Sequence, residues 1–218
     1  MKLLIALHII QLLTSNVHAS CGYGTHLHRR EEDGEIPPPK FGYDGLEGPL
    51  RWAELDIAAN TACNTGTRQS PINLITGSIT VDSGAAYKLA IADTPEAEFE
   101  NLGTTIEVPI TGTLETAVQS YILKQFHFHS PSEHLVDDVH FDMESHFVFE
   151  AEGNKSIAVV SFPVSVGATN DPLLGTVLSK AGNITATGSV TATPPLSFTT
   201  LIMHLESNPV FRQVLSLS

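Results

Sequence analysis

The chain has 218 residues, of which 42% are hydrophobic, and a formal net charge of −13 at pH 7. This length is typical of one domain that buries a sizeable core, and the hydrophobic content excludes a disordered acidic tail. Only 11 Lys and Arg residues stand against 24 Asp and Glu residues, which argues against a nucleic-acid partner and against binding to an anionic membrane surface.

The N-terminal segment, residues 1–19, is typical of a secretory signal peptide. It opens with a positive charge, residues 3–13 are almost entirely apolar, and small residues precede a cleavage point after Ala19. The segment is too short for a transmembrane helix, and no later segment is long and apolar enough to cross a bilayer. We therefore expect a secreted, extracellular protein, with candidate N-glycan sites at Asn154 and Asn183.

The rest of the chain divides into an arm and one domain. Residues 20–40 are polar, end in three prolines, and are predicted to form a loosely held arm, whereas residues 41–218 have a globular composition. Short runs of β-forming residues, punctuated by Gly, Pro and Asn, predict strands over 104–110, 117–129, 145–150 and 156–164. Helical periodicity predicts two short helices, over 172–181 and 198–205, with a loop between them. The fold class is therefore mainly β.

Histidines are concentrated on one face of two predicted strands. Along residues 121–129, alternation places Gln125, His127 and His129 on the same face. In the second strand, alternation places Glu144, His146 and Val148 on one face in the same way. If the two strands pair, three imidazoles converge, which is the ligand set of a catalytic zinc site with one open position. Gln125 and Glu144 each precede a histidine by two residues, so each can accept a hydrogen bond from a ligand ring.

The histidines allow two other interpretations. A second His-x-His pair, His26 and His28, lies in the polar arm and is interpreted as incidental. The spacing from His127 through His129 to Glu133 also fits the core of a cupin metal motif, but the flanking glycines of that motif are lacking.

These residues carry a resemblance to a known family, the α-class carbonic anhydrases. The segment from Gln125 to His134 reads QFHFHSPSEH, and Phe141, Glu144 and His146 follow at the family's spacing. The landmarks GPLRW, from Gly48, and RQSPIN, from Arg68, and the strand-like IAVV, from Ile157, also resemble family segments. The resemblance implies a large, twisted, mostly antiparallel central sheet with short peripheral helices.

The resemblance also implies a reaction and a role for each site residue. Zn²⁺ held by His127, His129 and His146 would lower the pKa of a bound water to about 7, and the hydroxide would attack CO2 to give bicarbonate and a proton. Gln125 and Glu144 match the partners of the ligand histidines, and His134 matches a buried structural histidine. Glu133 matches a catalytic carboxylate that orients a threonine hydroxyl, and the apolar pocket for CO2 is matched by Val148 and Val159.

Three departures from the family pattern are visible. Thr104 stands where many relatives carry a proton-shuttle histidine, so no shuttle is expected, because threonine does not titrate near neutrality. Residues 195–212 resemble the stretch just before the family's threonine segment, which predicts a domain truncated at its C-terminal end and lacking some strands. Cys63 resembles a family cysteine whose partner is absent, so it either pairs with Cys21 or stays free.

Two functions follow from these features. The first is zinc-dependent, reversible hydration of CO2 by a carbonic anhydrase, with CO2 and bicarbonate as its small-molecule substrates. The second is a catalytically impaired or inactive carbonic-anhydrase-like binding or structural protein, because the threonine segment is missing from the sequence.

Overall fold

The computed structural model describes residues 8–14, 41–58, 60–67, 69–153 and 156–216. The predicted arm and most of the predicted signal peptide lie outside these residues, as do His26, His28, Cys21 and Asn154. Cys63 is exposed and forms no disulfide within the part of the chain that the structure describes.

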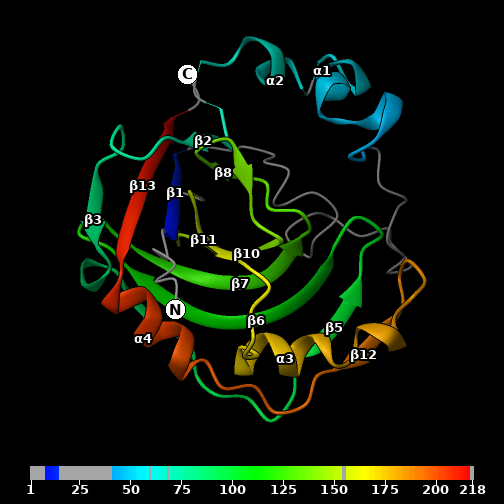
Figure 1. The fold of residues 1–218 in the computed structure, drawn as a ribbon, viewed down its shortest axis with the longest axis vertical. Coiled ribbons are helices and arrows are strands. Elements are labelled where there is room, and N and C mark those ends of the chain that lie inside the picture. The colour runs from blue at the N-terminus through cyan, green and yellow to red at the C-terminus, as the bar shows by residue number, and fades with distance from the viewer. Residues whose placement is uncertain (1–7, 15–40, 59, 68, 154–155, 217–218) are drawn as a thin grey trace.

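A single large sheet dominates the fold (Figure 1). Nine of its ten strands form a continuous row, and every neighbouring pair is antiparallel except β1 and β13. The predicted mostly antiparallel central sheet is therefore confirmed. In order, the row is β12 (Val190–Ala192), β5 (Glu98–Asn101), β6 (Ile106–Glu115), β7 (Ser120–His129), β10 (Met143–Glu150), β11 (Ile157–Val164), β1 (His8–Thr14), β13 (Pro209–Ser216) and β3 (Val81–Ser83), with β4 (Lys88–Ala90) paired to β6.

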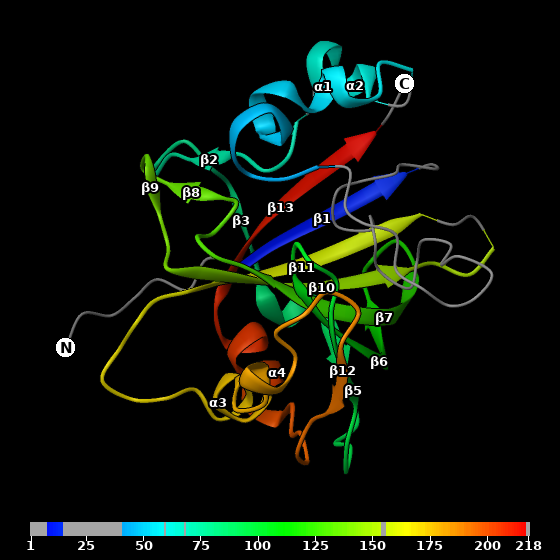
Figure 2. The same ribbon diagram turned by 90° about the vertical axis from the view of Figure 1, so that its right-hand side faces the viewer.

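Short elements cover the two sides of this sheet (Figure 2). On one side lie the helices α3 (Pro172–Leu178) and α4 (Thr199–Ser207). The other side carries α1 (Trp52–Leu55), α2 (Thr61–Thr65) and a small sheet of β2 (Asn73–Leu74), β8 (Leu135–Val136) and β9 (Val139–His140). Four 3₁₀ turns complete the fold: η2 (Gly45–Glu47), η3 (Pro49–Arg51), η4 (Gly84–Ala86) and η5 (Ala181–Asn183).

The predicted strands and helices are present with shifted ends. β7, β10 and β11 match their predicted runs to within about three residues, which is the usual uncertainty of element ends. β6 runs five residues further than predicted, to Glu115. α3 begins where expected because Asp171 caps it, accepting a hydrogen bond from the Leu174 amide at 2.9 Å, and Pro172 occupies its first turn. The segment predicted as loop between the helices contains the three-residue edge strand β12.

Residues 8–14 of the predicted signal peptide form strand β1, between β11 and β13. Ile10 is paired with Val160 on one side and with Arg212 on the other. Within the described row, β13 and β3 join the rest of the sheet through β1. A chain cleaved after Ala19 would lack this strand, so the sheet described here belongs to the uncleaved chain, and the signal peptide stays a prediction.

The main core lies between the sheet and the helices α3 and α4. Phe126 of β7 stacks on Phe147 of β10 with ring centroids 4.8 Å apart, and Phe198 meets Phe126 edge-on. Leu173 and Leu205, from the two helices, are buried in the same cluster. Because side chains alternate along a strand, the phenylalanines that fill this core force the residues between them onto the opposite face. Those residues are the histidines.

Candidate metal centre

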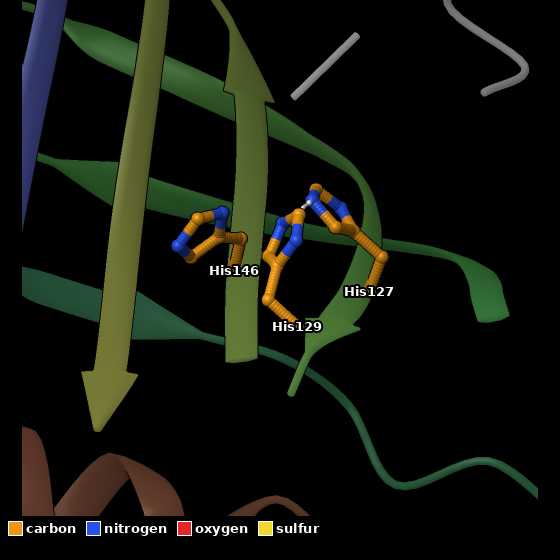
Figure 3. Close-up of side chains that lie close together, drawn as sticks. All are labelled: His127, His129 and His146. Carbon is orange, nitrogen blue, oxygen red and sulfur yellow. Dashed lines mark hydrogen bonds between the residues drawn. The ribbon is translucent and has the colours of Figure 1, made fainter. Parts of the chain in front are cut away.

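Strands β7 and β10 bring three histidines together (Figure 3). In the antiparallel register His146 lies directly opposite His127, and Glu144 lies opposite His129. The Nε2 atoms of His127 and His129 are 3.1 Å apart, and one ring nitrogen from each of the three histidines lies within 4.8 Å of the others. The convergence expected from strand alternation therefore occurs in the structure.

The donor set fits zinc. Two nitrogens at about 2.0–2.1 Å from a tetrahedral zinc lie roughly 3.3 Å from each other, which is close to the Nε2 separation of His127 and His129. The side chains are almost enclosed, since those of His129 and His146 are 9% and 2% exposed. Three imidazoles with no thiolate are the ligands of catalytic zinc sites that leave one position open.

Two of the three ligand rings have an acceptor from their own strand. The Nδ1 atom of His127 lies 2.9 Å from Oε1 of Gln125, so this nitrogen carries the proton and Nε2 is left with a lone pair. For His146 the roles are exchanged, because Nε2 lies 3.0 Å from Oε1 of Glu144 and Nδ1 is left to face the cluster. Both acceptors precede their histidine by two residues, as the spacing in the sequence predicts.

Glu144 is the most heavily contacted side chain of the site. It is fully buried and accepts hydrogen bonds from the backbone N–H and from Nδ1 of His134, at 2.9 and 2.7 Å. Burial by itself raises the pKa of Glu144, but the charge of His146 and the hydrogen bonds from His134 and His146 outweigh it and hold this pKa well below its usual range. Glu144 is therefore a permanent negative charge behind the ligands, and His134 is the residue that fixes it.

Two of the three histidines, His127 and His129, are held neutral. Burial lowers the pKa of His127 well below its ordinary value, and the neighbouring His129 and His146 lower it further. Burial, followed by the charge of His146, lowers the pKa of His129 to about 4. Neutral imidazole is the form that binds a metal, so His127 and His129 can bind one at neutral pH without first losing protons.

Glu133 reaches the cluster from the loop that joins β7 to β8. The hydroxyl of Ser132 accepts a hydrogen bond from the Phe141 amide at 2.8 Å and donates one to the carbonyl of His134, which folds the loop against the start of β10. In this position Oε2 of Glu133 lies 3.5 Å from Nε2 of His129. Its Oε1 accepts a hydrogen bond from the hydroxyl of Tyr43 at 2.8 Å.

The predicted pocket residues lie beside the ligands. Val148 is directly paired with Val159 of β11, and the two buried side chains form an apolar cluster of their own, on which Ile157 packs. Thr104 is half-buried in the turn that precedes β6. A cavity of about 490 Å³ lies elsewhere, against the phenylalanine face of β7 and β10, and none of the three histidines lines it.

Two further residues at this site, Tyr43 and Glu107, were not predicted from the sequence. Tyr43 contacts both Glu133 and His129, and its signal in the sequence is its place among the aromatic residues Phe41 and Trp52. Glu107 of β6 is completely buried and its backbone pairs with that of His127. The sequence does hint at Glu107, because a carboxylate in the middle of a predicted strand is unusual. Its register places it beside the histidines.

Comparison with known proteins agrees with this geometry. Residues 47–212 match the family model of eukaryotic-type carbonic anhydrases. A carbonic anhydrase of Neisseria gonorrhoeae is 34% identical over 168 residues, which cover 75% of this chain and 60% of the relative. A carbonic anhydrase of Pectobacterium carotovorum is 34% identical over 136 residues, which cover 61% of this chain and 53% of that protein. The chain thus spans little more than half the length of these curated relatives.

A solved structure of a fungal alpha carbonic anhydrase from Aspergillus oryzae superposes with a TM-score of 0.71 at 34% sequence identity, covering 82% of this chain and 85% of that one. The family match extends over most of the described domain and favours the carbonic anhydrase interpretation of the histidines over the cupin alternative. The chain belongs to the eukaryotic-type carbonic anhydrase family.

Proposed function

We propose that this protein is a carbonic anhydrase, a carbonate dehydratase of the lyase class, that catalyses the reversible hydration of CO2 to bicarbonate and a proton with Zn²⁺ as its cofactor. The observation that carries the proposal is the convergence of three buried imidazole nitrogens, with His146 directly opposite His127 in the β7–β10 register. Zinc held by three histidines lowers the pKa of a bound water to about 7 and so supplies hydroxide at neutral pH.

The residues around the histidines divide the remaining work. Gln125 and Glu144 hold the rings of His127 and His146 in the tautomer and orientation that leave one nitrogen for the metal. Val148 and Val159 offer an apolar wall, which suits a substrate as nonpolar as CO2. Glu133 places a carboxylate beside His129 and holds a neighbouring hydroxyl in position.

Proton release is proposed to depend on the buffer. Thr104 has no group that titrates near neutral pH, so it cannot relay a proton from the site to the solvent. We expect the rate of CO2 hydration to rise with the concentration of an imidazole buffer, and Thr104→His to reduce this dependence. A rate that is independent of buffer concentration would contradict this part of the proposal.

The central test is CO2 hydration by the purified chain, followed by stopped-flow with a pH indicator. We expect activity that disappears when a chelator removes the metal and returns with stoichiometric zinc. The matched control is His204→Ala, which removes an exposed histidine of α4 and is expected to change neither zinc content nor activity. Full zinc loading without CO2 hydration would overturn the enzymatic proposal and favour the catalytically impaired binding or structural protein.

We also propose that the chain is exported. Support comes from the signal-peptide pattern of residues 1–19, and among the described helices none is long and apolar enough to span a membrane. Asn183 is exposed in η5, as an N-glycan acceptor must be. Mass spectrometry of the protein recovered from a eukaryotic secreting host tests cleavage after Ala19 and glycans at Asn154 and Asn183 together. Recovery of an uncleaved, cell-retained chain would contradict export.

A further inference from the structure

The third ligand, His129, needs a partner that its own strand cannot supply. His127 and His146 each receive an acceptor from the residue two positions earlier, Gln125 and Glu144. For His129 the residue two positions earlier is His127, which is itself a ligand of the cluster. Strand alternation therefore leaves the second nitrogen of His129 without a same-strand acceptor, and a ligand whose second nitrogen is not held can adopt the wrong tautomer.

Tyr43, from the segment before η2, occupies the place of that partner. Its hydroxyl oxygen lies 3.1 Å from Nδ1 of His129 and 2.8 Å from Oε1 of Glu133. The phenol has a single hydrogen, and a carboxylate can only accept, so this hydrogen goes to Glu133. The phenol oxygen then accepts the Nδ1 proton of His129, and the Nε2 lone pair of His129 is left facing Nε2 of His127.

A small aromatic cluster fixes the position of Tyr43. Its ring packs edge-on against Phe41 and Trp52, with centroids 6.2 and 5.9 Å apart. The indole N–H of Trp52 lies 3.0 Å from the carbonyls of both Gly42 and Glu47, which ties the two sides of the loop together. The loop is closed by a hydrogen bond of 2.8 Å from the Gly42 amide to the Glu47 carbonyl. Tyr43 is 44% exposed, so it lies at the rim of the site, while its hydroxyl contacts His129 and Glu133.

We propose that Tyr43 is a positioning residue of the metal centre, which holds His129 in its Nδ1–H tautomer and links this ligand to Glu133. The proposal rests on the proposed function only in that a metal occupies the three-histidine site. It assigns the segment before η2 a part in the site, because the third ligand is oriented by Tyr43, which lies 86 positions away in the chain.

The test is Tyr43→Phe, which removes the hydroxyl and keeps the ring. The first readout is zinc affinity, measured by competition with a chromophoric chelator, and we expect a loss of about 10- to 100-fold, typical of removing the partner of a metal-binding histidine. The second readout is the tautomer of His129 in the metal-free protein, measured by long-range proton–nitrogen correlation with ¹⁵N-labelled histidine and assigned with His129→Ala. We expect the Nδ1–H form in the parent protein and a shift toward the Nε2–H form in the variant.

The matched control is Tyr87→Phe. The Tyr87 hydroxyl also donates to a carboxylate, that of Asp82 at 2.7 Å, but it belongs to the main core rather than to the metal centre. We expect this control to leave zinc affinity and the His129 signals unchanged. Tyr43 could instead only hold the segment before η2 against the domain. In that case Tyr43→Phe lowers the midpoint of thermal unfolding but leaves the His129 tautomer and the zinc affinity unchanged, and this result overturns the proposal.

Neither the zinc affinity nor the His129 tautomer depends on catalytic activity, so the two proposals can fail separately. A parent protein that binds zinc, shows the tautomer change on substitution and hydrates no CO2 would support the role of Tyr43 and refute the proposed enzyme. A parent protein that hydrates CO2 and tolerates Tyr43→Phe in both readouts would do the reverse.

Discussion

The candidate metal centre has an inner and an outer part that are built in different ways. In the inner part, His127 and His146 lie opposite each other in the middle of the sheet, and each has its partner two residues earlier on the same strand. In the outer part, His129 is the last residue of strand β7. It is contacted by Glu133 from a loop and by Tyr43 from the segment before η2. Backbone register builds the inner part, whereas the outer part depends on the packing of remote segments.

The inner ligands are expected to give the largest effect. His146→Ala removes one of three imidazoles, and the two that remain rarely hold a catalytic zinc, so we expect zinc binding to fall below detection. The measurement is zinc content by atomic spectroscopy after dialysis at pH 7.5, with circular dichroism to verify that the sheet is intact. A stoichiometric zinc content in this variant would refute the assignment of His146 as a ligand.

The second prediction compares the loss of zinc affinity and stability when Glu144 or Gln125 is replaced. Glu144→Ala removes the acceptor of His146 and leaves two buried donors of His134 without a partner, so we expect a 10- to 100-fold loss of zinc affinity and a fall in unfolding free energy of about 2–3 kcal/mol. Gln125→Ala removes the acceptor of His127 and leaves the two donors of His134 paired with Glu144, so we expect a smaller loss of stability. Equal losses of stability in the two variants would show that His134 gains nothing from Glu144.

The face that carries each inner histidine was predictable from the sequence, because it depends only on a period of two, whereas the pairing of the two strands had to be assumed. Alternation along residues 121–129 places Gln125, His127 and His129 on one face of the strand, opposite the phenylalanines between them. The strands that carry the site were found for the same reason, since β7, β10 and β11 are long and rich in β-branched and aromatic residues.

The outer part and the edges of the sheet were not predictable in this way. Tyr43 reaches His129 through a tertiary contact across 86 positions, and its place among aromatic residues indicates a packed segment but not the residue that it contacts. The pairing of residues 8–14 as β1 was hidden because a short apolar segment reads equally well as a signal peptide and as a buried strand. The strand β12 has only three residues, too few for a periodic signal.

The third prediction concerns pH and the metal-free protein. The folded-state pKa of His129 is lowered to about 4, against an ordinary value of 6.5, so between these values the unfolded chain binds more protons than the folded protein. The free energy of unfolding therefore decreases as the pH falls through this range, by about 2 kcal/mol from His129 alone between pH 7 and pH 5. The buried His127 acts in the same direction.

Urea unfolding of the metal-free protein at the two pH values measures this change. His129→Gln is the matched variant, because it keeps a polar side chain and removes the titrating ring, and we expect it to lose a share of the pH dependence. If the variant shows the same pH dependence of the unfolding free energy as the parent protein, His129 is already solvated in the metal-free state and the site is not enclosed there.

The smallest expected effect comes from weakening the loop that carries Tyr43 without changing a residue that contacts the histidines. Trp52→Phe keeps an aromatic ring but removes the N–H that bonds the carbonyls of Gly42 and Glu47, so the loop that carries Tyr43 is held less firmly. The loss of about 1 kcal/mol of hydrogen bonding predicts a drop in zinc affinity of about fivefold, smaller than that of Tyr43→Phe. The decisive comparison is the double variant. If Trp52 acts only through the Tyr43 hydroxyl, Trp52→Phe has no further effect on zinc affinity once Tyr43 is phenylalanine, whereas additive losses would mean that the aromatic cluster reaches the histidines by a second route.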